Sequence, residues 1–535
     1  MTESTTVKAE AADPAEAGAG RLSLPARAAR TLVLASVFTC AACGLVYELA
    51  LVALGSYLMG NSVTQASIVL SVMVFAMGVG SLLAKPLRHR PVVAFAIVEA
   101  ALALLGGLSV LALYAAFAWL SLYTPALVVV AFLVGALIGA ELPLLMTLLQ
   151  RIRRQEAGAA VADLFAADYV GALIGGLAFP FLLLPFFGHI KGALLVGAVN
   201  VVAGTAVVLW LFRKEVGRAT QAALWAGMAA VLIVLGGTYA LADEFEVSAR
   251  QVLYRDPIVL SKKTPYQEIV VTRQVTVAGR PDVRLFLNGD LQFSSVDEYR
   301  YHESLVHPIM SGPHGRVLVL GGGDGLALRE VLRYKDVKSA TLVELDPEVL
   351  RLARTYEPLV SLNERAFEDP RARTVEADAF SWLRGLNEQF DTVIVDMPDP
   401  DDVATAKLYS VEFYGLVKRV LAPGGRMVVQ SGSPYFAPKS FWSIEKSVAA
   451  AGLATVPYHV DVPSFGDWGY VMAAPTEKAP ALKLAPDAPK LRFMDEALLH
   501  ASTVFPKDRR SRDVETNTLV HPRLVEYQQQ EWKDA

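Results

Sequence analysis

Five acidic residues in the second half of the chain follow short apolar runs or lie just beyond one: Asp324, Glu344, Asp378, Asp396 and Asp399. Each acid alone could be a helix cap or a solvated loop residue, and Asp324 in particular could cap the helix that follows it. Together they predict a strongly anionic cleft. Such a cleft favours a cationic substrate, such as a sulfonium or an amine, and repels a phosphate-rich dinucleotide.

The first of these acids stands in a glycine-rich turn. The apolar run 316–320 precedes Gly321, Gly323 and Asp324, and a helical pattern continues to Tyr334. This order predicts a buried strand, a tight turn and a helix start. Glycines let a backbone approach a ligand closely, and a helix N-terminus directs free N–H groups at it. Gly321 and Gly323 are therefore candidate ligand-binding residues, with a purely structural glycine turn as the alternative.

Three further segments read as strands that end in acids. These are 340–343 with Glu344, 373–377 with Asp378, and 390–395 with Asp396. A carboxylate about twenty residues after a glycine turn suits a ribose diol. Asp378 could accept a hydrogen bond from an adenine amino group. Because open α/β sheets bind ligands at the carboxyl ends of their strands, we predict a nucleoside-binding α/β domain over residues 313–475.

A small β-domain is expected before it, over residues 250–312. Residues 267–271 and 283–287 alternate as strands do, and Asn288-Gly289 is a strong signal for a tight hairpin before the run 290–293. Residues 476–535 begin with a stretch rich in Pro, Ala and Lys and continue as a polar segment. We expect them to form a linker and a peripheral C-terminal tail.

The first half of the chain is far more apolar. The whole chain of 535 residues is 53% hydrophobic, with a mean hydropathy of +0.39, which exceeds that of ordinary soluble proteins. We predict a disordered cytosolic tail over 1–30 and a membrane domain of about seven helices over 31–242, in a multi-pass protein of the cell (inner) membrane. The expected spans are 31–57, 66–85, 92–119, 124–148, 165–187, 191–212 and 221–242.

Basic residues gather in alternate loops between these spans. They are Arg21, Arg27 and Arg30; Lys85, Arg88 and Arg90; Arg151, Arg153 and Arg154; and Arg213, Lys214 and Arg218. The positive-inside rule then places the N-terminus in the cytoplasm. Seven crossings would put everything after residue 242 outside, whereas nucleosyl cofactors are made in the cytosol. Either one segment, for which 165–187 is the first candidate, fails to cross, or the second half faces outward.

Several ionisable groups lie within or beside the expected spans. Glu48, Glu99, Glu141 and Asp168 are candidates for a transport or ligand role, with pairing inside the bundle as the alternative. The net charge of -4 implies no bulk attraction to nucleic acid.

At this point the chain resembles spermidine synthase, the polyamine aminopropyltransferases. The resemblance covers about 250–475 and implies a Rossmann-like, class I methyltransferase-like fold. The motifs that carry it are Tyr266-Gln267, Asn288-Gly289-x-x-Gln292, Asp297-Glu298-x-x-Tyr301-His302-Glu303, Gly321-Gly322-Gly323-Asp324-Gly325, Glu344-x-Asp346, Asp396-x-x-Asp399-Pro400 and Pro423-Gly424-Gly425. The apolar half looks like the multi-spanning module fused to some bacterial members.

The resemblance implies that decarboxylated S-adenosylmethionine is the co-substrate and that no metal is needed. Glu344 would hold the ribose and Asp378 the adenine. Gln267 and His302 would line the same pocket, and Asp324 would bind the amine end of the aminopropyl arm.

The implied reaction passes the aminopropyl group to an amine such as putrescine, which gives spermidine and methylthioadenosine. Asp396 would be the catalytic base and Tyr301 would orient the attacking nitrogen, while Asp399 and Gln292 would bind the acceptor. A carboxylate suits this task because it attracts an ammonium and can accept its proton. The small β-domain resembles one used for pairing in soluble relatives, which suggests a homodimer or higher homo-oligomer.

The chain departs from the family near the acceptor amine, whose identity therefore stays open. Asn288 stands where the family often has Asp, Asp401-Asp402 replaces a Gly-Pro pair, and a substrate-side tyrosine is absent near 463–470. Two alternatives remain: a methyltransferase that uses S-adenosylmethionine itself, and a polyamine transporter or sensor whose α/β domain only binds.

Overall fold

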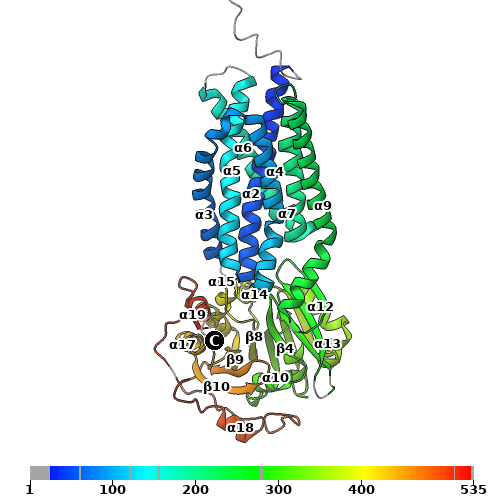
Figure 1. Cartoon of the computed structure of the whole chain (residues 1–535). Helices are drawn as coiled ribbons and strands as arrows, with labels where there is room; N and C mark the ends of the chain where they lie inside the picture. Colours follow the sequence, from blue (N-terminus) through cyan, green and yellow to red (C-terminus); the bar gives the residue numbers. More distant parts are fainter. Residues whose placement is uncertain are drawn as a thin grey trace, which may run out of the picture. The chain divides into compact units, whose positions relative to one another are not determined.

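The protein divides into two compact units, Met1–Arg255 and Asp256–Ala535, which are described separately (Figure 1). The computed structural model describes residues 25–59, 62–120, 122–152, 157–254, 256–276, 279, 281–510 and 512–531. Residues 1–24 of the predicted tail lie outside the described residues. The first helix begins at Ala26, within the segment predicted as tail.

The first unit is helical throughout its length. Its α-helices are α2 Ala26–Met59, α3 Ser62–Leu83, α4 Pro91–Ala115, α5 Tyr123–Ile152, α6 Ala157–Ala178, α7 Leu184–Val201, α8 Val207–Leu211 and α9 Arg218–Leu253, joined by the short helical turns η1 Pro86–His89, η2 Ala116–Leu120, η3 Phe179–Leu183 and η4 Val202–Ala206. The last helix, α9, continues beyond residue 242, where the sequence composition changes.

Six helices of the described residues are long and apolar enough to cross a membrane, one fewer than the seven spans predicted. The difference arises at Val161–Leu211, a single run of 51 residues that contains both the fifth and the sixth predicted spans. A straight helix of that length would measure about 77 Å, more than twice the roughly 30 Å of a bilayer core. The run is not straight, because Gly188 has a φ of 68° and breaks the helix.

Contacts with α2 show that the chain reverses at Gly188. The carboxylate of Asp163 pairs with Arg30 near the start of α2, and the ring of His189 stacks on Tyr57 near its end, with ring centroids 5.8 Å apart. The chain then returns, and the Ser36 hydroxyl donates to the Ala203 carbonyl at 3.2 Å. The run therefore traverses the bundle twice, so both predicted segments are full passes.

The second unit opens with a small antiparallel sheet. Its strands are β1 Ile258–Lys263, β2 Glu268–Val275, β3 Pro281–Leu287 and β4 Asp290–Ser294, in the order β1-β2-β3-β4. The predicted hairpin is confirmed: Asn288 and Gly289 both have positive φ, 53° and 99°, and join β3 to β4. Positive φ at both central residues fits the tight turn that Asn-Gly favours.

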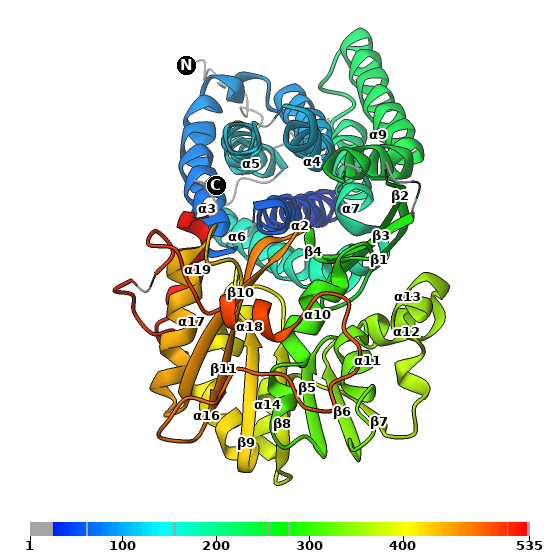
Figure 2. The ribbon, with the colours of Figure 1, turned by 90° about the horizontal axis from the view of Figure 1, so that it is seen from below.

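A larger sheet follows, with the strand order β10-β11-β9-β8-β5-β6-β7, visible as adjacent arrows in Figure 2. The strands are β5 Arg316–Gly321, β6 Ser339–Glu344, β7 Ala372–Glu376, β8 Phe390–Asp396, β9 Leu421–Gln430, β10 Ala454–Val462 and β11 Gly466–Ala474. Strands β5 to β9 pair in parallel, and β11 is antiparallel to both neighbours. The four strands predicted to end in acids are confirmed, and the fold is Rossmann-like.

Helices cover both faces of the larger sheet. They are α10 Glu298–Val306, α11 Leu326–Leu332, α12 Pro347–Thr355, α13 Glu357–Leu362, α14 Ala379–Gly385, α15 Val403–Ala406, α16 Val411–Val420, α17 Pro438–Ala450, α18 Glu496–Ala501 and α19 Arg523–Glu531, with short turns η5 Ile309–Ser311, η6 Ala366–Glu368 and η7 Lys407–Tyr409.

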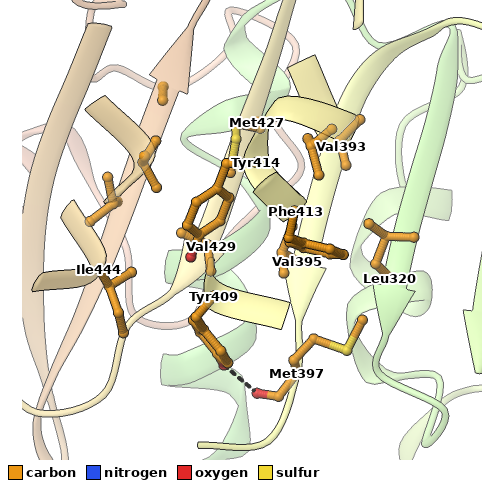
Figure 3. Close-up of a cluster of buried hydrophobic side chains, with 14 of the residues drawn as sticks. Leu320, Val393, Val395, Met397, Tyr409, Phe413, Tyr414, Met427, Val429 and Ile444 are labelled. Carbon is orange, nitrogen blue, oxygen red and sulfur yellow. Dashed lines mark hydrogen bonds between the residues drawn. The ribbon is translucent and has the colours of Figure 1, made fainter. Parts of the chain in front are cut away.

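The core of this unit lies on both sides of β5. Leu318 and Leu320 pack with α14, α16 and α17, and Val317 and Val319 pack with α10 and α11. This double burial explains why β5 reads as a continuous apolar run in the sequence. Figure 3 shows the first of these clusters, in which the Tyr409 hydroxyl donates to the Met397 carbonyl at 3.0 Å.

The prediction of a peripheral tail over 476–535 is wrong for the described residues of that segment. Leu524 is fully buried in the core of the α/β domain, and Glu531 accepts hydrogen bonds from the first backbone N–H groups of α17. Asn517 is also fully buried; its side chain donates to the Ala406 carbonyl at 2.7 Å. The sequence did not reveal this because the buried residues are too widely spaced to form a period. They include Ala485, Met494, Leu499, Phe505 and Val514.

We predict that Asn517→Ala lowers the free energy of unfolding by about 1–3 kcal/mol, because it leaves buried backbone groups without partners. The measurement is equilibrium urea unfolding followed by near-UV circular dichroism. Leu519→Ala, two residues away on a side chain that is 48% exposed, is the matched control and should change stability by about 0.5 kcal/mol or less. Equal effects of the two substitutions would contradict a structural role for this segment.

Candidate functional site

The ends of four parallel strands meet at the point where the strand order changes direction. Asp396, the last residue of β8, lies opposite Gly321, the last residue of β5. Glu344 ends β6, one residue beyond the pairing of Leu320 with Val343. From β5 the chain continues outward to β6 and β7 on one side and later to β8 and β9 on the other. Such a switch point is where α/β sheets form their ligand-binding crevice.

The turn after β5 needs glycine because two side chains approach its backbone too closely to leave room for a Cβ. Gly322 has a φ of 62°, and a Cβ there would lie 2.8 Å from Oδ2 of Asp396. A Cβ on Gly323 would lie 2.6 Å from Oε2 of Glu344. The turn therefore brings two carboxylates against bare backbone. The structure places both predicted ligand-binding glycines, Gly321 and Gly323, in this crevice.

Asp396 and Tyr301 form a direct pair. The Tyr301 hydroxyl, from α10, donates to Oδ1 of Asp396 at 2.6 Å. Burial raises the pKa of Asp396 to about 6, and the nearby charge of Asp324 adds to the rise, against the opposing effects of His302 and of the tyrosine hydrogen bond. Asp396 is therefore mostly ionised at neutral pH and close enough to its pKa to exchange a proton.

His302 is held by two residues to which the sequence analysis gave no role. Its Nδ1 contacts the Glu298 carbonyl oxygen at 2.8 Å and the Glu298 carboxylate at 2.9 Å. Arg329 donates two hydrogen bonds to that carboxylate, at 3.0 and 2.9 Å. Burial alone would lower the pKa of His302, but the Glu298 contact, followed by the charges of Asp324 and Asp396, raises it.

Asp324 combines the two predicted readings. Its Oδ1 accepts from the Leu326 backbone N–H at 2.8 Å, as a local cap does. Its other oxygen accepts no hydrogen bond from the described residues. Burial raises the pKa of this carboxyl group, although the His302 charge opposes the rise. One oxygen thus supports the turn, and the predicted contact of Asp324 with the amine end of the aminopropyl arm stays a prediction.

Asp346 is hydrogen-bonded to both Glu344 and Gln267. Oε1 of Glu344 accepts from the Asp346 backbone N–H at 2.9 Å, and burial raises the pKa of Glu344 to about 7. The Gln267 amide donates to Oδ2 of Asp346 at 3.1 Å, and the Thr264 hydroxyl donates to the same oxygen at 2.7 Å. The β1–β2 loop of the small sheet is thereby anchored at the end of β6.

Asp378 is more occupied than the sequence suggested. Its Oδ1 caps α14 through the Ser381 N–H at 2.8 Å, and its Oδ2 pairs with Nζ of Lys407 at 2.8 Å. Burial tends to raise the pKa of Asp378, but the lysine and the cap outweigh it and the pKa is lowered. Nothing in the sequence pairs these two residues, which are 29 positions apart.

Asp399 is positioned from the neighbouring strand. Gln430, at the end of β9, donates to Oδ1 of Asp399 at 3.1 Å and to the Met397 carbonyl at 2.6 Å. Burial raises the pKa of Asp399 to about 6. Gln292, by contrast, lies on β4 and donates to the Asp290 carbonyl of its own hairpin at 3.1 Å. Among the described residues it has no hydrogen bond to the strand-end acids, and its substrate role stays a prediction.

The side chains at these strand ends are mainly acidic: Asp324, Glu344, Asp396 and Asp399. One potential metal-ligand group occurs among the described residues, formed by His314, Asp336 and Asp487. His314 directly precedes β5, so this group lies at the opposite end of that strand from the crevice.

Comparison with known proteins gives a consistent result. Residues 298–485 match the family described as "Spermine/spermidine synthase domain". Polyamine aminopropyltransferase 1 of Streptomyces coelicolor is 66% identical over 508 residues, 95% of this chain and 96% of that protein. Polyamine aminopropyltransferase of Mycobacterium tuberculosis is 48% identical over 513 residues, 94% and 97% of the two chains. A crystal structure titled as spermidine synthase in complex with the transition state analogue AdoDATO is 28% identical, covers 47% of this chain and 86% of its own, and has a TM-score of 0.42.

We predict that Gly323→Ala weakens binding of methylthioadenosine by about tenfold or more, equivalent to about 1.4 kcal/mol. The new Cβ would displace the Glu344 carboxylate, which it approaches to 2.6 Å. Isothermal titration calorimetry measures the change. The control is Gly415→Ala in α16, where a Cβ would meet no atom within 4 Å. Unchanged affinity in Gly323→Ala would separate the glycine turn from nucleoside binding.

Proposed function

Because the chain belongs to the polyamine aminopropyltransferase (spermidine synthase) family, we propose that its strand-end crevice transfers the aminopropyl group of decarboxylated S-adenosylmethionine to an amine such as putrescine. The observation that carries this assignment is the contact between Tyr301 and Asp396 beside the glycine turn. It supports the proposal because a carboxylate and a hydroxyl group lie in contact at the switch point of the sheet.

The donor nucleoside lies along the ends of β5, β6 and β7. Glu344 accepts from the ribose hydroxyls, because its Oε2 faces the Gly323 backbone while Oε1 is held by Asp346. Asp378 lies beyond it, at the start of α14, and accepts from the adenine amino group with Lys407 as its counter-ion. Gln267 and His302 complete the pocket. Asp324 offers its second oxygen to the ammonium end of the aminopropyl arm.

The reaction needs a deprotonated nitrogen more than it needs electrophilic assistance. The amine attacks the carbon next to the sulfonium, a C–N bond forms as the C–S bond breaks, and methylthioadenosine leaves as a neutral thioether. The proton released from nitrogen passes to Asp396, while Tyr301 keeps that carboxylate oriented. Holding the two cationic reactants together within an anionic crevice supplies proximity and offsets their repulsion.

The acceptor amine is held by Asp399, whose carboxylate is fixed by Gln430. Asp401 and Asp402 follow it in the loop before α15, where Asp402 caps the helix. Three acids in this loop suit an acceptor with more than one ammonium group. Gln292 of the small sheet remains our candidate for a further acceptor contact.

We also propose that the first unit is embedded in a membrane. Several of its helices present large apolar side chains outward: Phe75 of α3 is 67% exposed and Ile233 of α9 is 73% exposed. In water such surfaces would aggregate, whereas lipid accommodates them. The helices also satisfy their own backbone hydrogen bonds, as a spanning segment must.

The basic residues assign an orientation to this unit. Since successive passes alternate in direction, the connections at 84–90 and 212–217 share one end of the bundle with Arg27 and Arg30 of α2. That end carries the basic residues of three connections and of the N-terminal segment, so it is cytoplasmic by the positive-inside rule. The chain leaves the bundle at the other end, after Leu253. The transferase unit therefore faces away from the cytoplasm.

We predict that Asp396→Asn lowers kcat by about 100-fold or more, while affinity for methylthioadenosine changes by no more than about twofold. Because the pKa of Asp396 is about 6 in the ligand-free protein, kcat/KM of the unaltered enzyme should fall about tenfold per pH unit below that value, as the base becomes protonated. Steady-state assays with putrescine from pH 5 to 8 measure both effects.

A stability measurement shows whether Asp396→Asn acts through misfolding. The folded-state pKa of Asp396 lies above its unfolded value of about 3.9, so its ionisation destabilises the fold as pH rises through about 6. Asp396→Asn should then be as stable as the unaltered protein, or more so, at pH 8. Retained turnover in this variant would exclude Asp396 as the base.

The orientation is tested by cysteine labelling in intact cells. In a variant with Cys40 and Cys43 replaced by Ala, Glu388→Cys in the exposed loop before β8 should react with a membrane-impermeant maleimide. Lys85→Cys, at the basic end of the bundle, should react only after the cells are opened. The reverse pattern would place the transferase unit in the cytoplasm.

A further inference from the structure

Three polar side chains from three helices meet inside the first unit, and the proposed transferase chemistry uses none of them. Glu99 of α4 and Asn200 of α7 are both 0% exposed, and Glu141 of α5 is 6% exposed. The Asn200 amide donates to Oε2 of Glu99 at 2.9 Å. Glu141 and Cys40 of α2 lie close to Glu99. Polar groups this deep in an apolar bundle are costly unless they have partners.

The backbone around this cluster is shaped to its side chains. A Cβ at Gly204 would lie 2.8 Å from Cγ and 2.9 Å from Oε2 of Glu99. The nearby hydroxyl of Tyr47 is buried beside Gly106, where a Cβ would collide with the tyrosine ring at 2.7 Å. Glycine at both positions lets the helices close over the polar groups.

The cluster has acceptors but no cation. Oε1 of Glu99, Oε1 of Glu141 and Oδ1 of Asn200 are buried without a hydrogen-bond partner. Among the described residues no basic side chain forms an ion pair with Glu99 or Glu141, and two basic residues of the bundle are paired elsewhere: Arg30 with Asp163 and Lys191 with Asp243. Two neighbouring carboxyl groups in apolar surroundings cannot both ionise without a counter-ion, so one proton between them would leave one negative charge beside the three free acceptor oxygens.

We propose that this cluster is a second binding site for the primary ammonium group of a polyamine. An ammonium supplies the single positive charge and three N–H donors, one for each free oxygen. A proton alone would neutralise the charge but leave the Asn200 oxygen without a donor. No metal-ligand grouping occurs at these residues in the described chain. The choice of a polyamine rests on the proposed function, since amines of this class are what the transferase unit handles.

The site gives the helical unit a role of its own. The cation site is enclosed between α4, α5 and α7, which carry its three polar side chains. It would let the unit take up the substrate or the product of the reaction that the other unit performs.

The test is equilibrium dialysis of radiolabelled spermidine against the full-length protein in lipid nanodiscs, with aminopropyl transfer assayed on the same samples. Glu99→Gln and Asn200→Leu should each bind one amine fewer per chain than the unaltered protein. Their transfer rates should stay within about twofold of it. Glu48→Gln, on α2 and outside the cluster, is the matched control and should bind as the unaltered protein does.

The outcomes separate this site from the transferase assignment. Unchanged stoichiometry in both Glu99→Gln and Asn200→Leu, or a single bound amine in the unaltered protein, would overturn the bundle site. If Glu99→Gln fails to fold, Asn200→Leu decides alone, because it leaves both carboxyl groups in place. Loss of one bound amine together with no transfer to any amine by the unaltered protein would uphold the bundle site and overturn the proposed function.

Discussion

The second unit depends on the fit between a carboxylate and bare backbone where β5 and β8 end side by side. Asp396 reaches over a turn in which Gly322 leaves no room for a side chain. This contact fixes where the Asp396 carboxylate stands relative to the glycine turn. The parallel sheet must keep β5 beside β8 with Gly321 facing Asp396. The continuous burial of β5 on both faces secures that register, because a slip would move every core residue.

The remaining acids show how a fold keeps several negative charges in one crevice. Each is restrained by a donor from another element: Asp346 N–H for Glu344, Gln430 for Asp399, and Lys407 for Asp378. Burial raises the pKa values of Glu344, Asp396 and Asp399 to about 6 or 7. Keeping these carboxylates ionised away from water therefore costs free energy, and a bound cation lowers that cost. Affinity for sulfonium and ammonium groups follows from this burial of negative charge.

Both units bury carboxyl groups, but only one of them supplies a counter-ion. In the α/β unit, Arg329 neutralises Glu298 and so orients His302. In the helical unit, Asn200 donates a hydrogen bond to Glu99, and no basic side chain of the described residues pairs with Glu99 or Glu141. An acid pair without a counter-ion in an apolar bundle either stays neutral or recruits a cation. The lack of a basic partner is why we propose the Glu99 cluster of the bundle as a cation-binding site.

The sequence by itself determined the local features: the glycine turn, the acids at strand ends, the Asn288-Gly289 hairpin and the apolar helices. Each follows from neighbouring residues, whose periodicity and backbone preferences act over a few positions. Only the tertiary structure decided which distant groups meet. Examples are Arg329 with Glu298, Lys407 with Asp378, and Gln430 with Asp399. The reversal at Gly188 and the burial of Asn517 and Leu524 in the core also required it. These contacts join segments far apart in the chain, and their partners are chosen by packing, which leaves no periodic trace in the sequence.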